Sequence, residues 1–497
     1  MPLIIYYRKN SSKTKIMINL LFCCVLFSLD IVPQNVLWDH YTIIPPLGEV
    51  KSIVASPLSL LVISDNNLLV FEKYSLKLKK TLHFNDQNIY LLAYDRYSNE
   101  FWILGEKSII RLTMPTYTLR EYPVPEQAER LGVSRNYLYL DGVKNFSFDK
   151  RNGVTSLIQV FPEGIEWYKK TGDADIKKYP YLTPYYYFDE AEETQTPFAR
   201  FRITALYDDG MDIYVGTRGY GILKYNKISW QKKRIIYGPL DLHIRQVKKF
   251  DDKVYFVSHL GLSFFTAGTD EWHYHRFVRG INNILLSNKE LIITLGGEIS
   301  RIDKGMTFTI STLTTDVLCL SADETSFYIG TSTGLYKLYK GTNDPMQFGP
   351  EGYPIYCVLP ADGQIYAGGE FGFYRYDRDK KKWNKELNFG VKEIVQIKDV
   401  LYLLSTNNQL IKYRQEEDTD TNWVLLPYFN IYDIDSDDEV LYCATFAGIY
   451  YYEPDTELYK VIYNLPRIKY DYVFVTGKNI ISVSDSAIYS LPIEYRD

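Results

Sequence analysis

A phrase of about fifteen residues recurs along this chain about every forty residues, and this repeat limits the folds that the chain can adopt. One copy reads "SFYIGTSTGLYKLYKG" at 326–341, and near copies read "QIYAGGEFGFYRYD", "EVLYCATFAGIYYYE" and "DIYVGTRGYGILKYN". Aligned on one hydrophobic position, successive copies lie 36 to 41 residues apart, with a single interval of 75 residues. The aligned positions are Leu61, Trp102, Tyr139, Tyr214, Tyr255, Ile292, Tyr328, Tyr366, Tyr402, Tyr442 and Ile481. Such a period indicates a repeat architecture.

Each unit reads as four short strands. Around Tyr328 the runs "DVLCLSA", "SFYIGT", "LYKLYK" and "PMQFG" are separated by the turn sequences "DET", "STG" and "GTND". Asp and Gly are typical of hairpin turns, because Asp bonds its own backbone and Gly tolerates positive φ. An aromatic residue opens the fourth run at Trp230, Trp272, Trp383, Trp423 and Tyr459. Without a helical period of similar strength, the pattern predicts an all-β fold, a β-propeller of about eleven four-stranded blades.

The motifs "IYVGTRGYGILKYN" and "FYIGTSTGLYKLY" resemble the repeats of exported bacterial β-propellers of the two-component-regulator, WD40-like type. The shared pattern is a hydrophobic-aromatic pair, Gly-Thr, then Gly-hydrophobic-x-x-Tyr, and it covers roughly residues 45–497. The resemblance implies the blade and an exported protein. No transmembrane, kinase or DNA-binding module follows the last unit, so a signalling output in the same polypeptide is not expected.

The last unit supplies only three strands before the sequence stops at Asp497. Residues 37–45, with Trp38 in the aromatic position, read as a fourth strand without a blade. Pairing the two removes unpaired sheet edges, which favour aggregation. The N-terminal strand is therefore predicted to complete the last blade. Two rings are favoured over one large ring, because rings above about ten blades are uncommon.

Four segments are predicted along the chain. Residues 1–34 read as a signal peptide, or as an N-terminal anchor, because a basic stretch precedes a short apolar core. Residues 35–154 form a first group of blades, residues 155–200 a Tyr-rich insertion or degenerate blade, and residues 201–497 a second group. The expected location is the periplasm or cell envelope, with secretion as the alternative and no membrane span in the mature chain.

Composition excludes several classes of function. The net charge of -5 and the pI near 5.8 provide no basic surface for nucleic acid. Cys319, Cys357 and Cys443 lie in strand-like runs without metal-ligand spacing, so buried free thiols are expected. The 46 tyrosines suit strands and binding surfaces equally. No cofactor is predicted.

In propellers, ligands usually meet the face that carries the turns between second and third strands and the segments leading into first strands. These loops and the Tyr-rich segment contain cationic, acidic and aromatic side chains that suit a polar ligand. Thr333 and Asn407 occupy such turns as well. The predicted ligand-binding residues are Arg202, Arg218, His243, Arg245, His259, Glu370, Phe446, Tyr185, Tyr186 and Tyr187.

No catalytic residue and no metal ligand is predicted. Nucleophile elbows, P-loops and catalytic Cys signatures are absent from the sequence. His273 and His275 in "WHYHRF" share one side of a strand, but nothing in the sequence supplies a third ligand. The predicted function is non-catalytic binding of a peptide, protein or glycan. The alternatives are a lyase or hydrolase in the central funnel and a scaffold in an envelope assembly.

Overall fold

The computed structural model describes residues 40–179, 182, 185–188, 199–266, 271–277, 280–287, 289–303, 306–361, 363–414, 423–426, 430–437 and 439–496. In this part of the chain, strands form eleven antiparallel sheets, each built on a four-stranded meander. Every aligned position of the repeat lies on the second strand of its sheet. The predicted all-β propeller fold is therefore confirmed, with one sheet for each repeat.

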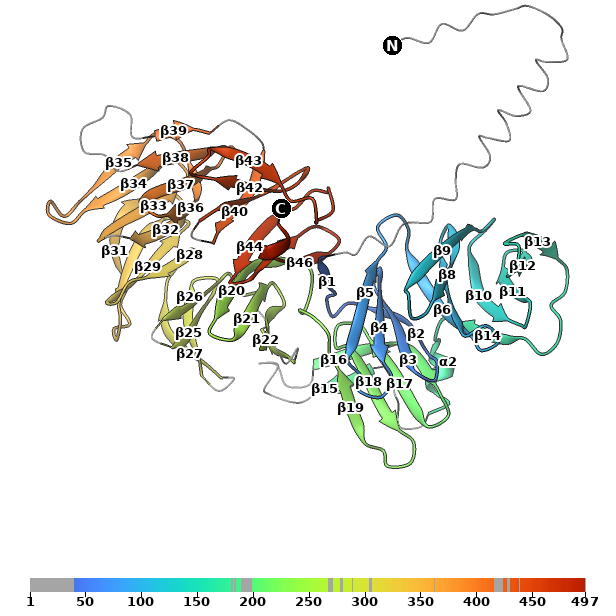
Figure 1. The fold of residues 1–497 in the computed structure, drawn as a ribbon. Helices are drawn as coiled ribbons and strands as arrows, with labels where there is room; N and C mark the ends of the chain where they lie inside the picture. Colours follow the sequence, from blue (N-terminus) through green and yellow to red (C-terminus); the bar gives the residue numbers. More distant parts are fainter. Residues whose placement is uncertain are drawn as a thin grey trace, which may run out of the picture.

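Seven sheets form a circuit. Their first strands are neighbours in the order β20, β24, β28, β32, β36, β40 and β44, and β44 lies against β20 again. Figure 1 shows these sheets on the left, coloured from yellow-green at β20 to red at β46. The strands are β20 (Ile244–Phe250), β21 (Lys253–Ser258), β22 (Gly261–Thr266), β23 (Trp272–Arg276), β24 (Asn283–Ser287), β25 (Glu290–Leu295), β26 (Glu298–Asp303), β27 (Met306–Thr312), β28 (Val317–Ala322), β29 (Ser326–Thr331), β30 (Gly334–Tyr339), β31 (Met346–Glu351), β32 (Ile355–Ala361), β33 (Gln364–Gly369), β34 (Gly372–Asp377), β35 (Lys382–Leu387), β36 (Val391–Ile397), β37 (Val400–Ser405), β38 (Leu410–Arg414), β39 (Trp423–Leu425), β40 (Ile431–Ser436), β41 (Leu441–Thr445), β42 (Gly448–Glu453), β43 (Leu458–Val461), β44 (Tyr472–Thr476), β45 (Asn479–Val483) and β46 (Ile488–Pro492), followed by the 3-10 turn η1 (Ile493–Tyr495).

The N-terminal strand completes the last of these sheets. β1 (Thr42–Ile44) pairs antiparallel with β46, with Ile44 opposite Ile488. Tyr41 packs edge-on against Tyr489, with 5.5 Å between ring centroids. The predicted closure is thus present for the described residues, while Trp38 and the predicted signal at 1–34 lie outside them.

Four further sheets are inserted between β1 and β20. Their first strands follow one another in the order β16, β2, β6 and β10. The strands are β2 (Val50–Ala55), β3 (Ser59–Ser64), β4 (Asn67–Glu72), β5 (Leu78–His83), β6 (Ile89–Asp95), β7 (Glu100–Gly105), β8 (Ser108–Thr113), β9 (Thr118–Pro123), β10 (Ala128–Val133), β11 (Tyr137–Gly142), β12 (Asn145–Asp149), β13 (Thr155–Ile158), β14 (Glu166–Lys169), β15 (Tyr185–Phe188), β16 (Ala199–Asp208), β17 (Asp212–Thr217), β18 (Ile222–Asn226) and β19 (Lys232–Ile235). The β16–β19 sheet, which the sequence assigned to the second group, therefore packs with the first.

The segment predicted as an insertion or degenerate blade links the two end sheets of the inserted group. β13 and β14 add to the β10–β12 sheet on opposite edges. The helical turn α2 (Asp173–Ile176) follows, and buried Ile176 packs into the core of the β16–β19 sheet. Tyr179 donates to Asp208 on β16 over 2.7 Å, and Tyr168 on β14 donates to the carbonyl of Tyr94 on β6 over 3.0 Å.

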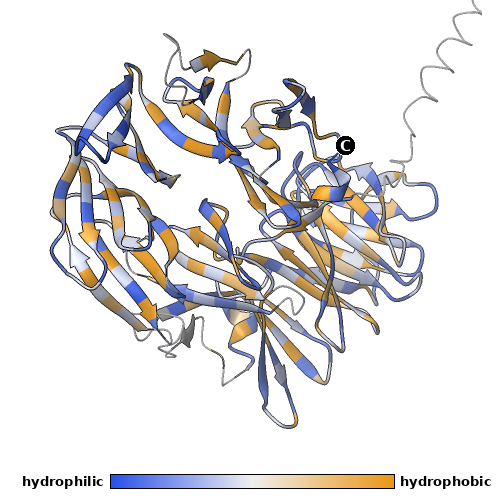
Figure 2. Ribbon diagram, turned by 60° about the vertical axis from the view of Figure 1, so that its left-hand side comes forward, coloured by the Kyte–Doolittle hydropathy of each residue, from blue (hydrophilic) through white to orange (hydrophobic). Residues whose placement is uncertain are grey.

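Alternating apolar side chains pack the sheets face to face, which Figure 2 shows as orange and blue bands along the strands. One buried cluster combines side chains of β4, β18, β21 and β45, so the two groups share a core. Many tyrosines are structural. Tyr328 and Tyr442 are buried on their second strands, and each donates over 2.7 Å to an aspartate of the preceding turn, Asp323 and Asp437 respectively. In these two sheets the acidic turn thus satisfies a buried phenol group.

Candidate functional site

A cleft of about 570 Å³ opens where the first and last sheets of the seven-sheet circuit meet. It lies on the face formed by the turns between second and third strands and the segments leading into first strands. Its lining residues are Leu242, His243, Ile244, Arg245, His259, Asp471, Tyr472, Val483, Ser484 and Asp485. A volume of this size falls within the usual range of ligand pockets.

The segment before β20 forms one wall. Leu240 and Ile244 are buried in the shared core, and the backbone N–H of Leu240 donates to the Ser263 hydroxyl over 2.9 Å. Two anchored residues on either side hold the intervening stretch in place. His243 therefore lines the cleft from a fixed backbone, with Asp241 beside it, while the following Arg245 donates to Asn282 over 3.0 Å.

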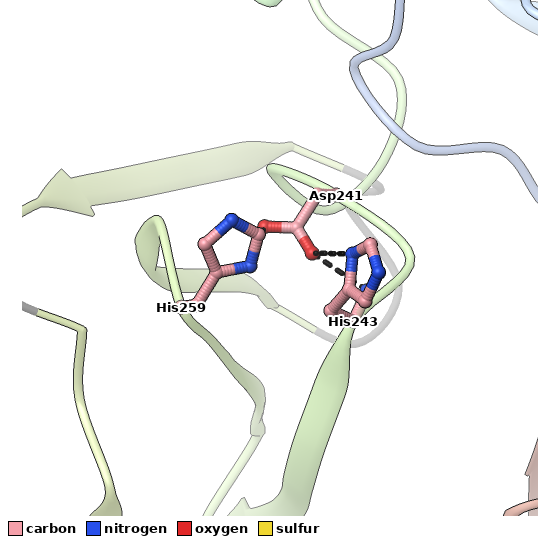
Figure 3. Close-up of side chains that lie close together, drawn as sticks. All are labelled: Asp241, His243 and His259. Carbon is pink, nitrogen blue, oxygen red and sulfur yellow. Dashed lines mark hydrogen bonds and ion pairs between the residues drawn. The ribbon is translucent and has the colours of Figure 1, made fainter.

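Asp241 lies between two imidazole rings, as Figure 3 shows. Its Oδ1 accepts the backbone N–H of His243 over 2.6 Å and lies 3.4 Å from Nδ1 of the same residue. Its Oδ2 lies 3.5 Å from Nδ1 of His259, which occupies the turn between β21 and β22. The two imidazole centroids are 5.2 Å apart. Within the described residues these side chains form a group with metal-ligand spacing, each offering one donor atom within 4.8 Å of the others.

The opposite wall is acidic and aromatic. Asp471 precedes β44 and Asp485 lies in the turn between β45 and β46, and a hydrogen bond with Asp471 raises the pKa of the Asp485 carboxyl. Lys469 pairs with Asp471 over 2.6 Å. Tyr472 is 36% exposed, and partial burial raises the pKa of its phenol. The cleft can therefore donate to, accept from and stack against a polar ligand.

The structure brings together three of the predicted binding residues, His243, Arg245 and His259, in this cleft. Glu370, which accepts a hydrogen bond from Tyr356, and exposed Phe446 occupy the equivalent turns of other sheets in the circuit. Both therefore lie on the same face, outside the cleft.

The other predicted binding residues belong to the inserted group. Arg218 pairs with Glu49, and Arg202 is exposed on β16. Tyr185, Tyr186 and Tyr187 form β15, which pairs with β16, and their side chains lie outside the described part of the chain. Of these residues, Arg202 and Arg218, whose side chains the structure describes, do not line the cleft.

Asp241, Asp471, Tyr472 and Asp485 were missed at the sequence level. They occupy the same kinds of loop as the residues that were chosen, so position within the repeat was an available signal. The sequence could not show which sheets contribute loops to the cleft, because only the closed circuit places the loops of the last unit opposite those of the first.

His273 and His275 play a different part. Both rings stack on Phe264 of the neighbouring strand, with centroid distances of 5.0 Å and 5.8 Å. Their shared side of β23 is thus occupied by an aromatic contact.

A second polar cluster lies on neighbouring first strands in the circuit. Glu393 Oε2 accepts the backbone N–H of Ile434 over 3.0 Å, and Asp433 Oδ2 accepts that of Val473 over 2.8 Å. Burial raises the pKa of both carboxyls, and the charge of Glu393 raises that of Asp433 further. Because each carboxyl accepts a backbone N–H of the next sheet, the pair joins adjacent blades.

The inserted group has a smaller cavity of about 270 Å³, lined by β2, β6, β14, α2 and β16. On its walls Tyr168 donates to the carbonyl of Tyr94 on β6 and Tyr179 donates to Asp208 on β16, so hydrogen bonds between elements cross this cavity's borders. Of the predicted binding residues whose side chains are described, none lines this cavity.

No family model and no curated protein matches the sequence. Solved structures that are similar include the extracellular domain of BT4673 from B. thetaiotaomicron, proposed as a one-component system in one crystal structure and as a hybrid two-component system in another. Both share 13% identity over 89% of this chain and 70% of theirs, with TM-scores of 0.43 and 0.44. PorZ, a surface component of the type-IX secretion system of Porphyromonas gingivalis, shares 10% identity over 92% of this chain and 81% of its own, with a TM-score of 0.35.

Among the described residues, no helix is both long and apolar enough to span a bilayer.

Proposed function

We propose that this chain is an exported, non-catalytic binding propeller of the cell envelope that holds a peptide, protein or glycan in the cleft between its first and last blades. The observation that carries the proposal is the composition of the cleft, where Arg245, Tyr472 and the Asp471–Asp485 pair converge on one opening. A cation, two carboxylates and a phenol match ligands rich in both donors and acceptors, which peptides and glycans are. The predicted signal at 1–34 supports export.

Because the circuit is rigid, the loops of the cleft lose little conformational entropy when a ligand binds. The wall segments lead into β20 and β44, which pair with β21 and β45, and the turns that complete the cleft leave β21 and β45, which are paired on both sides, so the loops are held before a ligand arrives. Preorganisation of this kind lowers the conformational cost of association. Exposed Phe446 and Phe371 on the same face provide apolar surface for a larger ligand.

The catalytic alternative, a lyase or hydrolase in the central funnel, remains a prediction. Its best acidic candidates, Glu393 and Asp433, both bond the backbone of the adjacent sheet. The scaffold alternative would place the partner on outer strands instead of the cleft.

Peptide and glycan arrays probed with the purified protein test the proposal. For a captured ligand, Arg245→Ala and Tyr472→Ala should each weaken binding at least about tenfold, equivalent to about 1.4 kcal/mol, without changing the melting temperature. Arg218→Ala is the matched control, because this arginine pairs with Glu49 outside the cleft. Binding that survives both cleft substitutions would overturn the assignment, and chemical conversion of a captured ligand would favour the enzyme.

A further inference from the structure

We propose that Asp241, His243 and His259 form a Zn²⁺-binding site at the rim of the cleft. The inference goes beyond the proposed function, because metal binding is measured without any organic ligand. Two imidazoles and one carboxylate are a donor set that Zn²⁺ accepts, and a site with three protein ligands leaves a coordination position for water or a ligand group.

The spacing of the donors fits one ion. Zn²⁺ binds imidazole nitrogen and carboxylate oxygen at about 2.0–2.2 Å, so two ligands of a tetrahedral ion are separated by about 3.4 Å. The distances from the Asp241 oxygens to the Nδ1 atoms of His243 and His259 are 3.4 Å and 3.5 Å. All three donors lie within 4.8 Å of one another. The separation of the two imidazole donors would then have to shorten by rotation of the side chains of His243, just before β20, and His259, in the turn after β21.

The carboxylate is held ready. The Asp241 side chain is 14% exposed, and the 2.6 Å bond from the His243 N–H fixes its Oδ1. Its Oδ2 is buried and accepts no hydrogen bond among the described residues. A buried carboxylate oxygen without a donor is costly, and coordination to a cation would compensate for that cost.

The backbone around His259 is equally constrained. Gly261 has a φ of +138°, and a Cβ there would lie 2.2 Å from the carbonyl oxygen of His275. Gly280 packs against the His259 backbone, where a Cβ would meet its carbonyl oxygen at 3.0 Å. The two glycines thus allow neighbouring backbone segments to pack closely at this turn, and this packing fixes the position of the His259 Cα atom.

The surroundings favour a cation. Asp471 and Asp485 face the site from across the cleft, and His243 interacts electrostatically with Asp485. On that wall Lys469 is paired with Asp471, and on the nearer wall Arg245 donates to Asn282. Three carboxylates therefore surround an opening whose two fixed cations are already engaged.

The test uses untagged full-length protein stripped with EDTA. Titration calorimetry with ZnCl₂ should show one ion per chain, and Co²⁺ should give the visible absorption bands of a tetrahedral site. His243→Ala, His259→Ala and Asp241→Asn should each raise the Zn²⁺ dissociation constant by about tenfold or more. The double variant His273→Ala/His275→Ala is the matched control, because it removes two histidines that stack on Phe264.

Circular dichroism must show that each variant is folded. If the wild-type protein binds no Zn²⁺ when ZnCl₂ is present at about 100 times the concentration of the chain, the proposal is overturned. Binding that is unchanged in a folded His243→Ala/His259→Ala variant would overturn it as well. Loss of organic-ligand binding leaves the metal titration unaffected, so the two proposals fail separately.

Discussion

The carboxyl pair of Glu393 and Asp433 makes wild-type stability depend on pH. Both groups lie immediately after a β-bulge in their first strands, and burial raises the pKa of each. A carboxyl whose pKa is raised in the folded state stabilises the protein below the ordinary carboxyl range, and this contribution is lost as pH rises through the folded-state pKa. The titratable and charged groups around the pair are Lys392, Asp435, Tyr472, Cys357 and Cys443, and Asp435 in turn faces Lys248.

Asp433→Asn removes the charge and keeps the bond. The amide oxygen still accepts the Val473 N–H, and the amide NH₂ becomes a donor towards Glu393. Replacing buried charges by neutral groups of similar volume stabilises proteins by about 1–4 kcal/mol. Since one charge of the pair remains, we expect Asp433→Asn to raise the free energy of unfolding by about 1–3 kcal/mol at pH 8. This gain corresponds to an increase of roughly 3–8 °C in the melting temperature of a unit of this size. Below about pH 4, where both proteins carry a neutral group, the difference should vanish.

Thermal melts from pH 4 to 8 measure this difference. Glu439→Gln, at an exposed site in the turn after β40, should change nothing. Asp433→Ala should lower stability by about 1–3 kcal/mol at pH 4, because the buried Val473 N–H loses its acceptor, and by less at pH 8, where the substitution also removes the buried charge. A gain for Asp433→Asn that is the same at pH 4 and pH 8, or a loss at pH 8, would refute the electrostatic reasoning.

Three further predictions concern the framework. Ile43→Asp places a charge against the core beneath β46. It should lower the free energy of unfolding by about 2–4 kcal/mol and produce aggregates that size-exclusion chromatography detects. Thr42→Asp, at an exposed position of the same strand, should have neither effect. Ile176→Asp should expose the β14–β16 region to limited proteolysis, and an unchanged cleavage pattern would contradict the role of α2 as a link. Burial raises the pKa of the Cys319 thiol to about 12 and that of Cys357 well above its usual range, so a thiol reagent at pH 8 should label these residues only after unfolding in urea.

The repeat made the sheets predictable and left their grouping open. Tyr328 and Tyr442 mark second strands because a buried phenol and a turn aspartate recur at fixed spacing, which is local chemistry. Grouping depends on contacts between first strands, such as the hydroxyl of Thr204 donating to the carbonyl of Val50 over 2.7 Å, and unit spacing is the same in both groups. The interval of 75 residues contains β13 and β14, which join the β10–β12 sheet, and β15, which joins the β16–β19 sheet.

The candidate site shows the same division. His243, Arg245 and His259 could be chosen from their loops, because the loop type follows from the strand order within one unit. Asp471 and Asp485 became neighbours of His243 only through closure of the circuit, which joins residues more than 200 positions apart.

Closure by β1 has a consequence for how the protein is made. Thr42 and Ser490, whose Oγ1 and carbonyl are 3.4 Å apart, are separated by 448 positions, so the first strand to leave the ribosome or the translocon meets its partner last. The inserted four-sheet group can assemble in the meantime, because its strands are contiguous in sequence. Until β46 has been synthesised, β1 has no partner strand, so the three-residue strand that is made early can dock only after the rest of the circuit has been made.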